Sequence, residues 1–265
     1  MRIHDVRRDP SFPRHESKTF RRREVADLKG LCVHHVAGGD NFRAMASYHV
    51  RGKDGPGAPY TFGIDYEGGI WLFHDLDRAT WSQGGRTVPD ADHDGAVEWE
   101  DGLKRANTYY LAIVLGGSFH SRYNDTGEQP RAAQVLALSA LLGVLLGDQA
   151  VLEQVGGDFP EELRGALGHL GWRDVYGHHD FGKVACPGDT VGTLLNALNA
   201  TDPRVTHHKA TEWQRALDAA DCDPGPVDGR WGMRSREALE RFQAKHDLPL
   251  TGHRDPQTAA RLFSL

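Results

Sequence analysis

A stretch of thirteen residues, 177–189, concentrates the side chains best suited to metal chemistry. They are His178, His179, Asp180, Lys183 and Cys186. Glycine and proline stand between them, where a chain turns sharply instead of continuing a helix or strand. Zn²⁺ suits a mixed nitrogen and sulfur ligand set, and a catalytic zinc takes three protein ligands and leaves a fourth position for water. His178 and Cys186 would supply two ligands, so the third must come from elsewhere in the chain.

An upstream pair of imidazoles, His34 and His35, offers the third ligand. The pair stands near the C-terminal end of an apolar run, residues 31–36, which predicts a buried strand. Adjacent strand side chains point to opposite faces, so at most one of the two can face a given site. We choose His34.

Three motifs follow one another in an order that matches a known family. They are the strand ending in His-His, the segment Pro-Tyr-Thr-Phe-Gly-Ile-Asp at 59–65, and Gly-His-His-Asp at 177–180 with Cys-Pro-Gly at 186–188. This pattern resembles the zinc-dependent type 2 N-acetylmuramoyl-L-alanine amidases, relatives of the phage lysozyme-type amidases and the peptidoglycan recognition proteins. The resemblance covers roughly residues 28–200.

The resemblance implies roles for individual residues. Zinc would be bound by His34, His178 and Cys186, and a family tyrosine beside the metal matches Tyr60. The family lysine lies two residues before the Cys ligand in some relatives, whereas this chain has Lys183 three residues before it. Lys183 is therefore either that lysine, shifted by one position, or a surface charge.

Several side chains would assist the metal ligands. Tyr60 and Lys183 are the candidates to donate to the developing oxyanion. His35, His179 and Asp180 are the candidates to hold the ligands, since a ligating histidine normally donates its other ring N–H to a carboxylate or carbonyl. No glutamate emerges as a general base.

The implied reaction is hydrolysis of the amide between N-acetylmuramic acid and L-alanine of the stem peptide in bacterial peptidoglycan. The residues alone predict metal-assisted amide hydrolysis with one catalytic Zn²⁺. Two alternatives stay open. One is a non-catalytic peptidoglycan receptor of the same fold, and the other is a zinc peptidase that cuts within the stem peptide.

Composition narrows the class of protein. The chain has 265 residues, 39% of them hydrophobic and 26% charged, a net charge of −6 and a mean hydropathy of −0.54. We therefore expect a soluble protein with one large or two modest domains, no transmembrane segment and no nucleic-acid partner. The three cysteines suggest no disulfide framework, and Cys32 and Cys222 are expected to be small core residues. We favour a monomer.

Four segments are expected along the chain. Residues 1–25 form a basic extension with eight Lys or Arg against four Asp or Glu. We interpret it as a solvated arm packed loosely on the domain, and attraction to an anionic surface is the alternative. Residues 26–198 form the zinc amidase domain, 199–209 a linker and 210–265 a peptidoglycan-binding domain.

The expected fold is a mixed central β-sheet flanked by helices, followed by a small all-α unit. Periodicity predicts strands at 31–36, 60–66, 69–74 and 109–116, and helices at 41–50, 130–146 and 160–170. Helices at 211–220, 235–246 and from 256 onward resemble the three-helix peptidoglycan-binding module, with Asp-Gly-Arg-Trp-Gly at 228–232 and Phe-Gln at 242–243. A generic helical dimerisation or capping unit is the alternative.

The N-terminus carries charge but no apolar run typical of a secretory signal. We therefore expect a protein made in the cytoplasm that acts on the cell wall after membrane breach. That behaviour is typical of a bacteriolytic phage or prophage endolysin.

Overall fold

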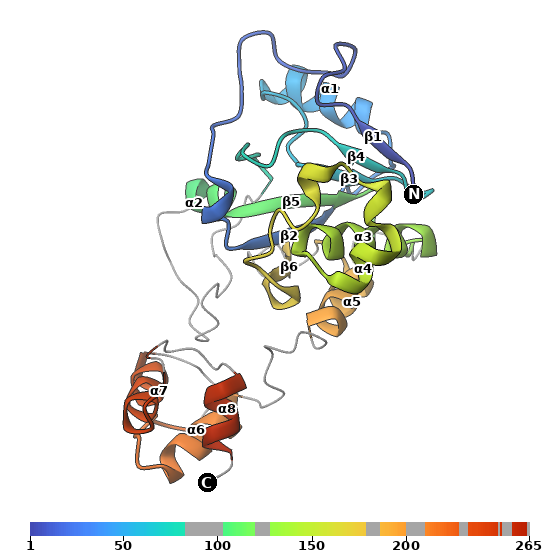
Figure 1. The fold of residues 1–265 in the computed structure, drawn as a ribbon. Coiled ribbons are helices and arrows are strands. Elements are labelled where there is room, and N and C mark those ends of the chain that lie inside the picture. The colour runs from blue at the N-terminus through green and yellow to red at the C-terminus, as the bar shows by residue number, and fades with distance from the viewer. Residues whose placement is uncertain are drawn as a thin grey trace.

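A six-stranded mixed β-sheet forms the centre of the N-terminal part of the chain in the computed structural model (Figure 1). The structure describes residues 1–82, 103–119, 128–178, 186–199, 210–227, 233–248, 250 and 256–263. The strands are β1 (Ile3–Asp5), β2 (Gly30–His35), β3 (Phe62–Ile64), β4 (Ile70–Leu72), β5 (Tyr110–Leu115) and β6 (Val175–Gly177), and their spatial order is β1-β4-β3-β5-β2-β6. Only β3 and β4 pair antiparallel, and every other neighbouring pair is parallel. The predicted mixed sheet is confirmed.

The β3–β4 hairpin lies where the sequence predicts it. Its turn contains Gly68 at φ 79°, a left-handed backbone conformation that glycine adopts without strain. The Asp65 carboxylate accepts hydrogen bonds from the N–H groups of Glu67 and Gly69 and from Nε1 of Trp71. This network holds the register in which Phe62 stands opposite Leu72.

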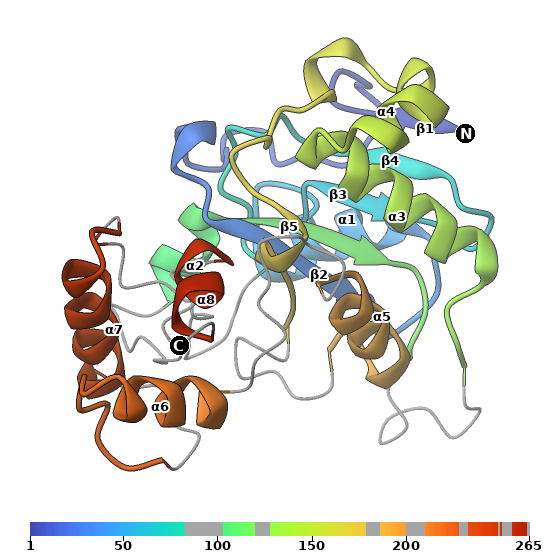
Figure 2. The same ribbon diagram turned by 60° about the horizontal axis from the view of Figure 1, so that its bottom comes forward.

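Helices cover both faces of the sheet (Figure 2). The face that carries Leu31 and Val33 packs against α3 (Ala132–Leu146) and α5 (Asp189–Asn199) in one large apolar cluster. The opposite face packs against α1 (Phe42–Lys53), where Phe42 lies in the same cluster as Val114 of β5. Strands that are buried on both sides appear in the sequence as continuous apolar runs, and β2 and β5 could be predicted for this reason.

Local signals account for the ends of the well-predicted helices. The Asn41 side chain accepts from the N–H of Ala44 and so caps the start of α1. Gly147 ends α3 in a left-handed conformation at φ 75°, as the sequence predicts for this position. Among the described residues, no single helix is long and apolar enough to cross a membrane; only α3 together with residues 149–158, bent by 118° at their junction, passes that test of length and composition.

The region after α3 differs from the prediction. The chain forms α4 (Gln149–Val155), which was missed, and the predicted helix at 160–170 is wrong, because only a 3-10 turn, η3 (Glu161–Leu163), forms there. The Asp148 carboxylate accepts from the N–H of Val151 and starts α4 directly after α3. Gly165 adopts φ 69°, which a helix cannot continue through. The remaining short helices are α2 (Leu103–Tyr109) and the 3-10 turns Val25–Asp27, Gly156–Asp158 and Trp172–Asp174.

The N-terminal segment is part of the folded domain, which corrects the expectation of a loosely packed arm. Its strand β1 pairs with β4, and Ile3 stands opposite Ile70. Phe12 and Phe20 are buried, and the buried Arg23 donates through Nε and Nη1 to backbone carbonyls outside the segment. A three-residue edge strand and isolated aromatics produce no periodicity, so the sequence pattern could not reveal this packing.

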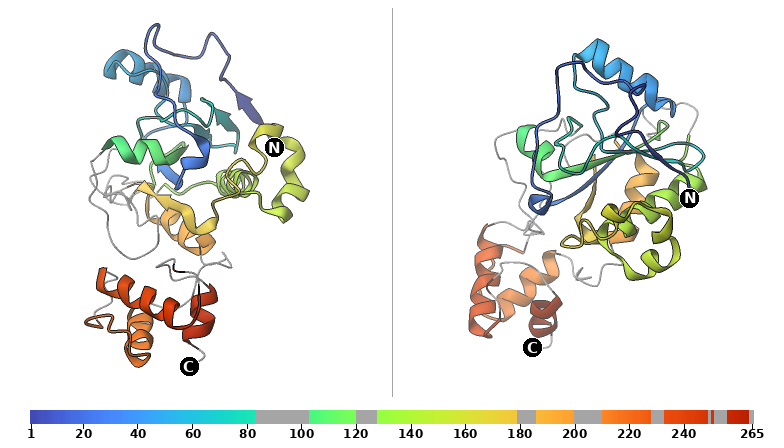
Figure 3. Two further views of the ribbon diagram at one scale, coloured as in Figure 1. Left: turned by 60° about the vertical axis from the view of Figure 1, so that its left-hand side comes forward. Right: turned by 45° about the horizontal axis from the view of Figure 1, so that its top comes forward.

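The C-terminal part contains α6 (Ala210–Ala219), α7 (Met233–Lys245) and α8 (Pro256–Leu262), which group around their own core (Figure 3). That core contains the predicted residues Trp213, Leu217, Leu239, Phe242 and Leu262. Buried amides are satisfied inside it, since Gln243 Nε2 donates to Thr258 Oγ1 at 3.1 Å. The predicted all-α unit is confirmed, whereas the motif at 228–232 lies outside the described residues.

Candidate metal centre

The register of two parallel strands places His34 beside His178. Val33 of β2 stands opposite Gly177 of β6, so the next residue of each chain segment projects at the same level. The two imidazole rings have centroids 4.3 Å apart, and the residues are only 1% and 8% exposed. A histidine pair that is 144 positions apart in sequence is thus brought together by strand pairing alone.

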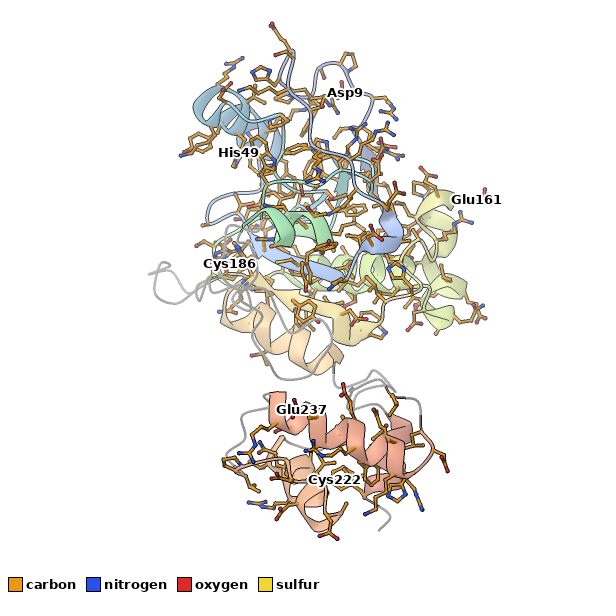
Figure 4. The ribbon with its side chains drawn as sticks, turned by 90° about the vertical axis from the view of Figure 1, so that its left-hand side faces the viewer. Asp9, His49, Glu161, Cys186, Cys222 and Glu237 are labelled. Atoms are coloured by element: carbon orange, nitrogen blue, oxygen red, sulfur yellow. The ribbon has the colours of Figure 1, made fainter. Side chains whose placement is uncertain are left out.

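Cys186 completes the cluster from the segment that leads into α5. Its Sγ lies 3.9 Å from Nδ1 of His34, and the candidate ligand atoms of His34, His178 and Cys186 all lie within 4.8 Å of one another. Figure 4 labels Cys186 at the edge of the strand layer. Two imidazoles and a thiol form the nitrogen and sulfur donor set that Zn²⁺ prefers.

The two ring nitrogens of His34 have different surroundings. Nε2 of His34 is fully buried and finds no hydrogen-bond partner within the part of the chain that the structure describes. A buried polar atom without a partner costs free energy, so native structures rarely leave one unsatisfied. Nδ1 of the same ring lies 3.9 Å from Sγ of Cys186, so it is the nitrogen placed to bind an ion together with the thiol, and the donor set of two imidazoles and a thiol fits a zinc ion.

Burial controls protonation in this cluster. Desolvation lowers the pKa of His34 well below its usual 6.5, and the neighbouring His178 and His35 lower it further. Desolvation also raises the pKa of the Cys186 thiol to about 12, although the hydrogen bond from the His35 backbone opposes this rise. The His34 imidazole can then act as a neutral ligand, and a cation would be needed to hold the thiol as thiolate.

His35 contributes through its backbone. Its N–H donates to Sγ of Cys186 at 3.4 Å, while its ring Nδ1 accepts from the N–H of Phe119 at 3.0 Å. Alternation along β2 therefore brings the His34 side chain to the cluster and turns the His35 side chain away from it. This role could not be predicted from the sequence, because every residue except proline has a backbone N–H and the residue type therefore does not identify the donor.

Tyr60 lies beside the cluster, in the residues that lead into β3. Its ring centroid is 5.2 Å from that of His34. The N–H of Thr61 donates to the carbonyl of Ala112 at 2.9 Å, which fixes this segment against β5. Burial raises the pKa of Tyr60, and the nearby Cys186 and Cys32 raise it further, so its phenol remains a proton donor at neutral pH.

Three predicted site residues, Lys183, His179 and Asp180, lie outside the described residues. Their roles stay predictions. The remaining two cysteines, Cys32 and Cys222, are buried and unbridged, as expected for small core residues.

Two family profiles match separate parts of the chain. One is described as N-acetylmuramoyl-L-alanine amidase and matches residues 24–189. The other is described as a putative peptidoglycan binding domain and matches residues 207–262. No curated protein sequence matches the chain.

Solved structures with a similar chain path share little sequence with this protein. Wild-type PGRP-LB of Drosophila is 15% identical, with a TM-score of 0.45 over 78% of this chain and 96% of that one. The Ph2119 endolysin from a bacteriophage of Thermus scotoductus MAT2119 is 14% identical, with a TM-score of 0.44 over 75% and 99%. The N-acetylmuramoyl-L-alanine amidase LysC from Clostridium intestinale URNW is 13% identical, with a TM-score of 0.42 over 76% and 96%.

Proposed function

Because the chain belongs to the N-acetylmuramoyl-L-alanine amidase family, we propose that it hydrolyses the amide bond between N-acetylmuramic acid and L-alanine in bacterial peptidoglycan, using one catalytic Zn²⁺. The observation that carries the proposal is the cluster of the buried His34 and His178 with the partly buried Cys186. A peptidoglycan receptor that only binds would have no need for a thiol among these donors.

The ligands would act together with the backbone of β2. His34 and His178 would bind the ion as neutral imidazoles, and Cys186 would bind it as thiolate. The N–H of His35 would stabilise the negative charge on that sulfur. When bound, the ion would supply Lewis-acid polarisation of the scissile carbonyl and would acidify the attacking water.

Two further side chains would act on the substrate. Tyr60, next to His34, would donate its phenolic O–H to the oxyanion that develops on the carbonyl. Lys183 is proposed as a second donor. His179 and Asp180 are proposed to accept the second ring N–H of a ligating histidine and so fix its orientation.

We propose the domain boundaries 26–198 for the amidase, 199–209 for a linker and 210–265 for a wall-binding domain. Residues 1–25 would then form the outer strand and rim of the amidase, which the pairing of β1 with β4 supports. Peptidoglycan binding by the C-terminal helices would raise the local concentration of substrate at the metal centre.

The pairing of an amidase with a wall-binding unit supports a bacteriolytic role, and we propose that the protein is a phage or prophage endolysin. It would reach the wall after another protein breaches the membrane. The protein should therefore lyse permeabilised cells and leave intact cells of the same strain unaffected when it is produced inside them.

Digestion of purified peptidoglycan, with mass spectrometry of the released fragments, tests the reaction. Zinc-replete protein should release stem peptides that begin with L-alanine, and chelation should abolish the release until zinc is restored. Fragments cut within the stem peptide would identify a peptidase instead. Wall binding without any released fragment would identify a receptor.

A pair of cysteine variants separates metal loss from general damage. Cys186→Ala should lose both bound zinc and activity, whereas Cys222→Ala, which changes a buried cysteine of the C-terminal core, should keep both. Zinc content is measured on each purified protein. A fully active Cys186→Ala protein without zinc would overturn the proposed mechanism.

A further inference from the structure

A cavity of about 250 Å³ lies between the N-terminal segment and the end of β4, and its lining is strongly cationic. One carboxylate, Asp75, faces five positively charged side chains in this lining. The cations are Arg7, Arg8, Arg14, Lys18 and Arg78. Four of the five belong to the first 25 residues, so half of the eight Lys and Arg residues of that segment gather around one hollow.

Two of these guanidinium groups are held rigidly. Arg7 contacts the carboxylates of Asp5 at 2.7 Å, Asp75 at 2.9 Å and Glu162 at 2.8 Å. Arg14 donates to the backbone carbonyls of Val6, Asp9 and Phe12. Asp5 and Glu162 do not line the cavity, so they fix Arg7 from outside it. A cation fixed in this way loses little conformational entropy when an anion binds beside it.

Two other cations remain accessible at the rim. The side chain of Arg8 is 84% exposed, and its ion-pair partner among the described residues is Asp75, at 3.3 Å. Lys18 is partly exposed and pairs with Asp54, which lies outside the lining. Asp75 is shared between Arg7 and Arg8, so one carboxylate serves two guanidinium groups. An incoming anion could therefore bind Arg8 without leaving Asp75 unpaired.

We propose that this cavity binds a phosphate group of a phosphodiester polymer in the cell wall. Guanidinium groups match the oxygen geometry of phosphate, and several can surround one phosphate from different sides. Arg7, Lys18 and Arg78 also pair with carboxylates outside the lining. Arg14 donates to backbone carbonyls and Arg8 shares Asp75 with Arg7, so the cavity keeps positive charge for an anion. The inference rests on the proposed function to the extent that the chain acts at a cell wall.

The cavity would give the amidase a wall contact separate from its metal centre. Its lining contains none of the candidate metal ligands. Figure 4 labels Asp9, whose backbone carbonyl accepts from the cavity-lining Arg14, in the N-terminal loop, well apart from Cys186. Anchoring through phosphate would therefore leave the metal centre open to the stem peptide. It would also bias the enzyme toward walls that carry such polymers.

Sedimentation of the full chain with purified walls tests the proposal. Walls are compared before and after chemical removal of their phosphodiester polymers, at several salt concentrations. We expect the wild type to bind native walls more tightly, with a steeper salt dependence. Arg8→Gln should weaken binding to native walls about five-fold, as expected for loss of one accessible ionic hydrogen bond, and should leave binding to stripped walls unchanged.

Arg22→Gln is the matched control, because Arg22 belongs to the same segment, is 76% exposed and has one carboxylate neighbour, Asp77, at 3.6 Å, but does not line the cavity. An equal loss in both variants would show a general charge effect and overturn the proposal. If Arg8→Gln also weakens binding to stripped walls, the cavity binds carboxylates of peptidoglycan and the phosphate proposal is wrong. Arg8-dependent binding to phosphatidylglycerol vesicles, with no preference for native walls, would overturn it in favour of lipid.

A second readout separates this inference from the amidase proposal. Cleavage of a soluble muropeptide, which carries no phosphate, should be equal in the wild type and Arg8→Gln. If the wild type fails to cleave it while the Arg8-dependent preference for native walls persists, the amidase proposal fails and the phosphate site stands.

Discussion

His74, directly after β4, is a largely buried neutral histidine whose protonation should destabilise the fold in acid. Its Nε2–H donates to the carbonyl of Ala58 at 2.9 Å, and its ring packs edge-on against Phe20 with centroids 4.9 Å apart. Burial is the main cause that lowers the pKa of His74 from its usual 6.5 to about 4, although the hydrogen bond to Ala58 opposes this change. Since one pKa unit corresponds to about 1.4 kcal/mol, the folded state resists protonation by about 3 kcal/mol.

The direction of the pH effect on stability follows from the protonation of His74 in the folded and unfolded states. Above pH 6.5 the imidazole is neutral in both the folded and unfolded chains, so His74 contributes no pH dependence to the free energy of unfolding. Between pH 6.5 and about 4 only the unfolded chain takes up the proton, and the folded state loses stability as the pH falls. Below about pH 4 both states are protonated, and the loss is complete at about 3 kcal/mol.

Urea unfolding of the full chain between pH 7.5 and 4 measures the effect, with His74→Gln as the reference. Glutamine stays neutral throughout and keeps an N–H donor for the Ala58 carbonyl. Because other groups titrate equally in both proteins, the difference between their pH profiles isolates His74. Across this range the free energy of unfolding of the wild type should fall by about 3 kcal/mol more than that of the variant. By NMR, the ring protons of His74 should titrate near pH 4. Parallel stability profiles, or a midpoint near 6.5, would refute the reasoning.

Two further predictions test the site and the core. Tyr60→Phe should keep the fold and the zinc content but reduce turnover about 100-fold, the typical cost of removing one oxyanion donor. Steady-state kinetics on a soluble muropeptide measure the turnover. Unchanged turnover would exclude Tyr60 as that donor. Leu141→Ala, which empties a fully buried position of α3, should lower the free energy of unfolding by about 2–5 kcal/mol. Leu136→Ala on the same helix, at a position that is 70% exposed, should change it by less than about 0.5 kcal/mol, and equal losses in urea titrations would contradict the assignment of the two helix faces.

The elements that sequence predicts well are those whose own residues determine them. In α3, apolar positions recur at helical spacing for fifteen residues and end at a glycine suited to a left-handed cap. Strands β2 and β5 are continuous apolar runs because both of their faces are covered. The hairpin depends on a turn whose glycine and aspartate act locally. Each of these signals can be recognised without knowledge of the rest of the fold.

The elements that sequence misses depend on distant partners. Strand β1 has three residues and owes its conformation to pairing with β4, in which Ile3 stands opposite Ile70, 67 positions away. The stretch 160–170 has enough apolar residues for a helix, yet the backbone N–H groups of Gly165 and Leu167 donate to the carbonyls of Val144 and Leu145 in α3. Tertiary hydrogen bonds therefore replace the local helical ones, which no window of sequence could indicate.

The candidate metal centre depends both on local sequence signals and on contacts between distant segments. Residue types and spacing indicate a metal site built from the two histidine pairs and Cys186, and the family resemblance implies His34, His178 and Cys186 as its ligands. What brings them within 4.8 Å is the parallel pairing of β2 with β6, a property of the folded chain. That same pairing turns His35 so that its backbone N–H, and not its ring, reaches the sulfur of Cys186. A substitution at position 35 that preserves the strand should therefore leave this hydrogen bond intact, whereas a proline there would remove the N–H donor and with it the hydrogen bond to the sulfur.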